Sequence, residues 1–218
     1  MTDEPPIFRL RGLSFSYGPD RQVLRGLDFE LRAGERVALT GSNGSGKTTL
    51  LHLMVGLIRP QQGMIEAFGV ARATEADFFE VRARAGFLFQ DSDDQLFSPT
   101  VIEDVAFGPL NFGKSSREAR GIATETLSSL GLSDLANRAT HKLSGGQRRL
   151  VALATVLAMK PAALLLDEPS AGLDEPNVER LIAILDQLPQ ARVIISHDAD
   201  FLTRTTSRNC RLVDGRIA

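Results

Sequence analysis

The chain has 218 residues, 43% of them apolar, which is enough for one compact unit with a substantial core but short for two independent domains. Its 25 Lys and Arg residues are balanced by 27 Asp and Glu residues, so the net charge of −2 leaves no positive excess to hold a nucleic-acid backbone. We therefore expect a single domain, residues 1–218, that does not bind nucleic acid.

The first half of the sequence alternates strand-like and helix-like segments. Strands are predicted over Arg9–Tyr17, Leu27–Leu31 and Arg36–Thr40, a helix over Lys47–Ile58, and further strands over Met64–Phe68 and Gly86–Phe89. The third strand enters a glycine-rich turn that leads straight into the helix. This order indicates a β-turn-α unit at the start of an α/β fold.

The middle of the sequence is helical. Helices are predicted over Val101–Phe112, Arg117–Leu130 and Gly145–Met159. Strands then return over Ala162–Leu166 and Arg192–Ile195, separated by a helix over Glu175–Leu188. Near the end of the sequence, Asp214-Gly215 indicates a hairpin turn. The predicted fold class is α/β, a mostly parallel sheet core with an antiparallel β part and an inserted helical subdomain. We expect a core lobe of residues 1–90 and 161–218 and a helical lobe of residues 91–160.

Residues 41–48 match the phosphate-binding pattern G-x-x-x-x-G-K-[ST] between a strand and a helix. Glycines let successive backbone N–H groups point at phosphate oxygens, Lys47 adds positive charge, and the Thr48 hydroxyl suits Mg²⁺. The alternative is a Gly/Ser turn without a ligand, but the strand-to-helix context favours a P-loop (RecA-like) nucleotide site. The residues assigned to nucleotide binding here are Gly41, Ser42, Asn43, Gly44, Ser45, Gly46, Lys47, Thr48 and Thr49.

Two adjacent carboxylates, Asp167 and Glu168, end the apolar strand that includes Leu164 to Leu166. Adjacent strand residues point to opposite sides of a sheet, so the two side chains cannot share one role. We predict that Asp167 helps to bind Mg²⁺ and that Glu168 is the base that orients water onto the γ-phosphate of the nucleotide. The alternative is an acidic strand end without a function.

A second anion-binding helix start is predicted at Leu143-Ser144-Gly145-Gly146-Gln147, with Ser144 as the N-cap. With the two motifs above, this pentapeptide resembles the signature of the ATP-binding-cassette family of transport ATPases, and the resemblance extends from Tyr17 to His197. It implies ATP hydrolysis in a head-to-tail dimer, a homodimer or a heterodimer with a second such ATPase. Ser144 and Gly146 of one subunit would then contact the γ-phosphate held by the other.

Four further positions match the family one by one. The resemblance implies that Tyr17 stacks on adenine, and that Gln90 contacts Mg²⁺ and the attacking water while its loop reports to a membrane subunit. It also implies that Asp174 crosses to the partner's site and that His197 senses the γ-phosphate.

Residues 89–97, 100–101 and 104–109 are similar to the ATPase subunits of energy-coupling-factor importers, which take up cobalt or nickel ions or vitamins such as biotin. Ser92 stands where that group usually has proline, and Asp93 and Asp94 are interpreted as a solvated acidic loop. The residues Leu96, Phe97 and Phe107 fit two alternatives, a groove for a helix of a membrane partner or part of the core. Many relatives continue into a C-terminal dimerising extension, so we expect this chain to dimerise only with ATP.

The predicted function is that of the ATP-hydrolysing motor of such an importer, at the cytoplasmic face of the cell membrane. The longest nearly apolar stretch, Leu150–Met159, is far shorter than a bilayer span, so membrane subunits must be other chains. Residues 1–6 do not resemble a secretory signal, and Cys210 is the only cysteine, which favours a reducing, cytoplasmic compartment. The alternatives are a soluble cassette ATPase of DNA repair or translation and a small-molecule P-loop kinase.

Overall fold

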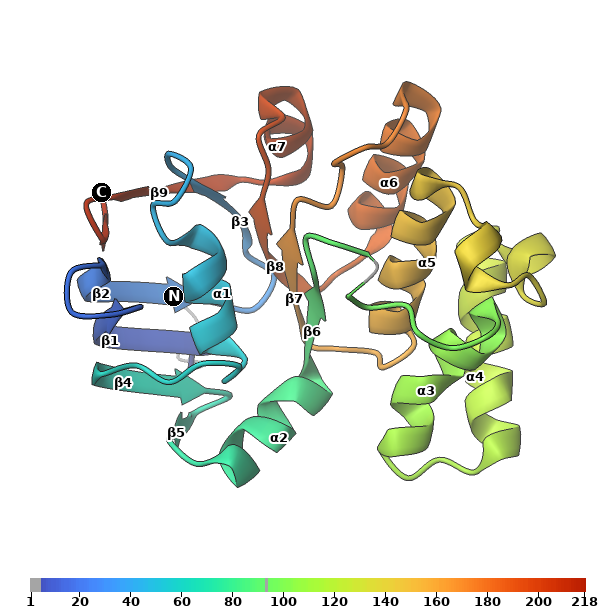
Figure 1. Cartoon of the computed structure of the whole chain (residues 1–218), viewed down its shortest axis with the longest axis horizontal. Coiled ribbons are helices and arrows are strands. Elements are labelled where there is room, and N and C mark those ends of the chain that lie inside the picture. The colour runs from blue at the N-terminus through green and yellow to red at the C-terminus, as the bar shows by residue number, and fades with distance from the viewer. Residues whose placement is uncertain (1–4, 93) are drawn as a thin grey trace.

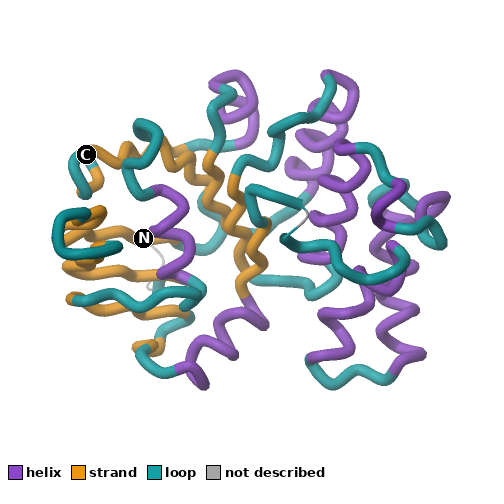
Figure 2. Tube along the Cα trace, viewed as in Figure 1, coloured by secondary structure: helices purple, strands orange, loops and turns teal. Residues whose placement is uncertain are grey.

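The computed structural model describes residues 5–92 and 94–218, and its strands form two sheets beside a group of helices (Figures 1 and 2). The antiparallel sheet has the order β2-β1-β4-β5. Its strands are β1 (Phe8–Ser16), β2 (Gln22–Leu31), β4 (Gln62–Ala67) and β5 (Val70–Arg72). Side chains such as Phe8, Leu10 and Leu31 alternate into a core shared with α1 (Lys47–Met54), as expected for a sheet with one buried face.

The second sheet has the order β10-β9-β3-β8-β7-β6 and is parallel except for β10. Its strands are β3 (Arg36–Thr40), β6 (Ala85–Leu88), β7 (Ala163–Asp167), β8 (Ala191–Ile195), β9 (Arg208–Val213) and β10 (Arg216–Ile217). Every residue of β7 and β8 is buried, because both faces of the sheet are covered. The carboxyl ends of parallel strands share one edge, so the loops after β3, β6, β7 and β8 meet there.

Helices gather at one end of the molecule (Figure 2). They are α3 (Val101–Asn111), α4 (Ser116–Ser129), α5 (Gly145–Leu157) and α6 (Glu175–Gln187), with the 3-10 turns η1 (Ser133–Leu135) and η2 (Thr140–Lys142) between α4 and α5. Helix α5 is buried on two faces: Val151 and Ala154 pack with α3 and α4, whereas Leu153 and Val156 pack with the parallel sheet. It therefore joins the helices to the sheet.

The predicted α/β class is confirmed, but three elements were missed and some boundaries differ: β2 begins at Gln22 instead of Leu27. Helix α1 ends at Met54 instead of Ile58, because Gly56 has φ 71° and a Cβ there would lie 2.2 Å from the Phe78 ring. The missed elements are β5, α2 (Glu75–Arg84) and α7 (Ala199–Thr205). Only Phe78 and Val81 are buried on α2, so its apolar periodicity is weak. No helix in the described part of the chain is long and apolar enough to cross a bilayer.

Candidate functional site

The glycine-rich loop after β3 leads directly into α1, as the sequence predicts. Gly46 caps the helix with φ 106°, and a Cβ there would lie 2.5 Å from Val23. At Gly41, with φ 149°, a Cβ would lie 2.5 Å from the Leu212 carbonyl oxygen. Only glycine fits these two positions, so the conformation of the loop depends on both of them.

Lys47, the first residue of α1, is buried and folds back over the loop. Its Nζ donates hydrogen bonds to the carbonyl oxygens of Gly41 (2.9 Å) and Ser42 (3.0 Å). The ammonium is thereby held over the loop that the sequence assigns to phosphate binding.

Tyr17 follows β1 and lies beside the loop. It lines a pocket of about 340 Å³ with Gly44, Gly46, Lys47 and Thr49, among other residues. The Tyr17 and Thr49 hydroxyls lie 3.2 Å apart in a hydrogen bond, and the ring is 53% exposed. An exposed aromatic face next to a phosphate-type loop is a suitable platform for a nucleotide base.

Thr48 and Asp167 meet across the edge of the sheet. The Thr48 hydroxyl donates to Asp167 Oδ2 over 2.7 Å. Asp167 Oδ1 is buried and accepts no hydrogen bond from the described residues. Burial raises the pKa of the Asp167 carboxyl, and the hydrogen bond from Thr48 opposes that shift. A buried carboxylate oxygen without a partner beside a hydroxyl is a donor set that fits Mg²⁺.

Glu168 has a backbone φ of 50°, which is rare for a residue with a side chain. Its Oε2 accepts a hydrogen bond from the His197 backbone N–H (3.3 Å), and its Oε1 lies 3.4 Å from His197 Nε2. Burial raises the pKa of the Glu168 carboxyl, while the bond from His197 lowers it. The structure thus brings the two residues together beside Asp167.

Gln90 follows β6 at the same edge, and its side chain is exposed. Its backbone carbonyl is bound by Arg149 of α5, a buried residue to which the sequence analysis assigned no role. Apart from the Ser92 hydroxyl, the hydrogen-bond acceptors of Arg149 are backbone oxygens, which no sequence motif records. Of the predicted acidic loop that follows, Asp93 lies outside the described residues.

Ser144 caps α5 in the predicted way: the Gln147 backbone N–H donates to Ser144 Oγ (3.3 Å), and the Ser144 N–H donates to Gln147 Oε1 (3.1 Å). Leu143 is buried in the helical core, and Gly145 has open space around it. A Cβ on Gly146 would lie 3.0 Å from Asn177 Nδ2. Asp174 caps α6 by accepting hydrogen bonds from Asn177.

The glycine-rich loop and the Ser144 end of α5 do not meet within one chain. Figure 1 shows α1 and α5 on opposite sides of β7 and β8. Near the start of α5, a small pocket of about 200 Å³ instead brings together Gln90, Gly145 and Gly172, among other residues.

An apolar groove of about 260 Å³ lies between α2 and β6 on one side and α3 and α5 on the other. Phe97 and Phe107, 63% and 43% exposed, line it and pack edge to face with centroids 4.6 Å apart. Leu96 is instead half-buried against the core. The two phenylalanines thus line a groove, whereas Leu96 belongs to the core.

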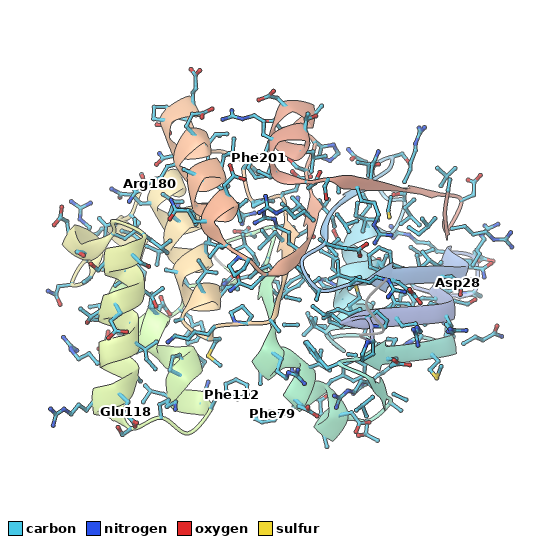
Figure 3. The ribbon with its side chains drawn as sticks, turned by 180° about the vertical axis from the view of Figure 1, so that it is seen from behind. Asp28, Phe79, Phe112, Glu118, Arg180 and Phe201 are labelled. Carbon is cyan, nitrogen blue, oxygen red and sulfur yellow. The ribbon has the colours of Figure 1, made fainter. Side chains whose placement is uncertain are left out.

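The groove has an aromatic bridge beside it. Phe79 of α2 and Phe112 at the end of α3 stack with centroids 5.0 Å apart, and both are exposed (Figure 3). This pair joins the two sides of the groove at the surface.

Comparison with known proteins defines the class. The sequence model of the ABC transporter family matches residues 24–171. A putative ABC transporter ATP-binding protein of Nitratidesulfovibrio vulgaris is 50% identical across 100% of this chain and 81% of its own length. The cobalt import ATP-binding protein CbiO of Rhodobacter capsulatus is 42% identical (97% and 77%), and the energy-coupling factor transporter ATP-binding protein EcfA of Methanothermobacter thermautotrophicus is 40% identical (97% and 69%).

Solved structures agree. CbiO1 of Clostridium perfringens, part of the transporter complex CbiONQ, has a TM-score of 0.86 at 32% identity, over 99% of this chain and 88% of that one. A dimeric ATP-binding cassette in a post-hydrolysis state with ADP and phosphate has a TM-score of 0.88 at 26% identity, over 96% of both chains.

The fold and the site are those of a P-loop ATPase of the cassette type. The chain belongs to the ABC transporter family, and it is an ATP-hydrolysing subunit related to the CbiO and EcfA import ATPases.

Proposed function

We propose that the chain is the motor subunit of an energy-coupling-factor type importer, acting at the cytoplasmic face of the cell membrane on separate membrane-embedded subunits. The cargo we propose is cobalt or nickel, or a vitamin such as biotin. The observation that carries this proposal is the apolar groove of Phe97 and Phe107 beside the loop of Gln90. A membrane subunit bound in this groove would be moved when the loop of Gln90 moves with ATP binding and hydrolysis. The similarity to CbiO and EcfA supports it.

In this proposal the loop of residues 41–49 and Lys47 bind the ATP phosphates, and Tyr17 stacks on adenine. Thr48, Asp167 and Gln90 would hold Mg²⁺, which neutralises phosphate charge when bound. Glu168 accepts the proton of the attacking water. Its raised pKa strengthens it as a base near neutral pH, and His197 positions its carboxylate.

The proposed active form is a dimer, with a second copy of this chain or with a related ATPase. The residues Leu143, Ser144, Gly145, Gly146 and Gln147, together with Asp174, would complete the partner's nucleotide site. The separation of α1 and α5 by the sheet supports this arrangement, because one chain cannot close its own site (Figure 1).

ATP is expected to trap the dimer when hydrolysis is blocked. Glu168→Gln with ATP and Mg²⁺ should sediment as a dimer, and without nucleotide as a monomer, because ATP bound between two chains stabilises the dimer by mass action. A dimer of the same strength in both conditions would show that contacts outside the nucleotide sites hold the chains.

The groove is tested by Phe97→Glu. In the free protein the new carboxylate stays hydrated, so melting temperature and basal ATPase should match the wild type. Burying it unpaired under a partner helix costs several kcal/mol, so co-purification with the membrane subunits should fall about a hundredfold or more. Val70→Glu, at an exposed apolar residue of the far sheet, is the control and should retain the complex.

Uptake assays in which this chain is co-expressed with the membrane subunits of a cobalt, nickel or biotin importer test the cargo and the function together. Labelled cobalt, nickel or biotin should accumulate only when the co-expressed chain hydrolyses ATP. If Phe97→Glu forms a normal complex and supports normal uptake, the groove is not the binding site for the membrane subunit. Uptake that does not depend on this chain would rule out its function as the motor.

A further inference from the structure

Arg149 lies in α5, five residues after the Ser144 cap, and is only 4% exposed. Figure 1 shows α5 between the parallel sheet and the helices α3 and α4, with the loop after β6 reaching from the sheet towards it. A buried guanidinium has five N–H donors to satisfy, so its partners reveal what it holds.

On one side Arg149 binds the loop that carries Gln90. Its Nη1 donates to the carbonyl oxygens of Phe89 (2.6 Å) and Gln90 (3.0 Å), with the Ser92 hydroxyl at 3.4 Å. The peptide groups on both sides of Gln90 are therefore hydrogen-bonded to α5.

On the other side Arg149 binds three successive carbonyls after β7. Its Nη2 donates to those of Asp167 (2.6 Å) and Glu168, and its Nε donates to that of Pro169 (3.2 Å). Glu168 is the residue with φ 50°, and such a conformation persists only where the surroundings determine it. Three carbonyls converging on one planar cation supply that restraint.

We infer that Arg149 is a positioning residue that fixes the backbone of Glu168 and Gln90 to the helix bearing Ser144, so that hydrolysis depends on the placement of that helix. The inference rests on the roles proposed above for Glu168 and Gln90. Arg149 itself does not touch the reacting atoms. A movement of α5 against the sheet must shift the loop of Gln90 and the segment of Glu168, because the guanidinium of Arg149 binds both of them to the helix.

Arg149→Lys tests this, because lysine keeps the charge but has no planar fork to span two segments. Misplacement of a site residue by about 1 Å can cost about a hundredfold in rate. We expect kcat to fall by about 10-fold to 100-fold, while KM and the Kd for ATP change by less than about threefold. Arg149→Gln should behave alike.

Arg180→Lys is the matched control. Arg180 of α6, labelled in Figure 3, also donates to two backbone carbonyls, those of Leu130 (2.5 Å) and Gly131 (2.7 Å), but it contacts no proposed site residue. Its substitution should leave kcat within about twofold, even where melting temperature falls as much as in Arg149→Lys.

The double variant of Arg149→Lys and Glu168→Gln distinguishes two errors, a wrong role for Arg149 and a wrong assignment of Glu168 as the base. If Arg149 acts partly through Glu168, then Arg149→Lys should lower the single-turnover rate of Glu168→Gln by a smaller factor than it lowers that of the wild type, and the ATP-trapped dimer should still form. Retained turnover in the single variant Glu168→Gln would reject the assignment of Glu168 as the base. The comparison of kcat and KM between Arg149→Lys and the wild type would still test whether Arg149 positions the site.

Four results would overturn the inference: an unchanged kcat, equal losses of kcat and ATP affinity, multiplicative losses in the double variant, or loss of the trapped dimer. Unfolding of both Arg149 variants below the assay temperature would also overturn it, since Arg149 would then serve stability alone.

Discussion

Glu168→Gln is expected to bind ATP as the wild type does and to hydrolyse it about 100-fold to 10,000-fold more slowly. An amide keeps the shape of the side chain and a hydrogen-bond acceptor for the His197 N–H, but it cannot take a proton from water, and a positioned base contributes a factor of this size. Fluorescent-nucleotide titration measures the first quantity, and phosphate release measures the second.

The control for this substitution is Glu179→Gln. Glu179 is exposed on α6 and pairs with Arg204, so its change removes a carboxylate without touching the site. Its phosphate release should match the wild type. Turnover retained in Glu168→Gln would assign the proton transfer to another group.

Lys47→Ala is expected to weaken ATP binding itself. The Lys47 ammonium is buried on the loop, and a charge-assisted hydrogen bond to phosphate is worth about 2 kcal/mol or more, equivalent to about 30-fold in Kd. Calorimetric titration at 10 °C gives the comparison.

Lys114→Ala, an exposed lysine between α3 and α4, should bind ATP normally. Lys47→Ala with unchanged affinity but slow turnover would move the role of Lys47 from the bound nucleotide to the transition state. A loss of folding, detected by the melting curve, would instead show that its bonds to Gly41 and Ser42 hold the loop.

The sequence predicted the loop, the Asp-Glu pair and the Ser144 helix start because each is a contiguous motif whose chemistry depends on neighbouring residues. It did not predict Arg149, because its oxygen partners lie 18 to 60 residues away along the chain and, apart from the Ser92 hydroxyl, belong to the backbone, which residues of any type can supply. The folded arrangement of β6, β7 and α5 is needed to see it.

Two smaller errors have different origins, one in long-range packing and one in the composition of a helix. Helix α1 was predicted too long because its stop depends on the Phe78 ring, which packs against Gly56 from a distant helix. Helix α2 was missed because its surface is polar, although Thr74 and Asp77 form a capping box at its start. Phe97 and Phe107 were left undecided between groove and core, because only the folded placement of α2 and β6 opposite α3 and α5 shows that their rings line an open groove.

The opposite placement of α1 and α5 also governs how activity responds to concentration. Under the proposed dimer, a dilute solution of this chain hydrolyses ATP at a rate that grows with the square of its concentration, because each turnover needs an encounter. Two chains held side by side on one membrane partner meet at an effective concentration near millimolar, whatever their number in the cell. The membrane partner on which the ATPase acts would thereby also increase the rate of ATP hydrolysis.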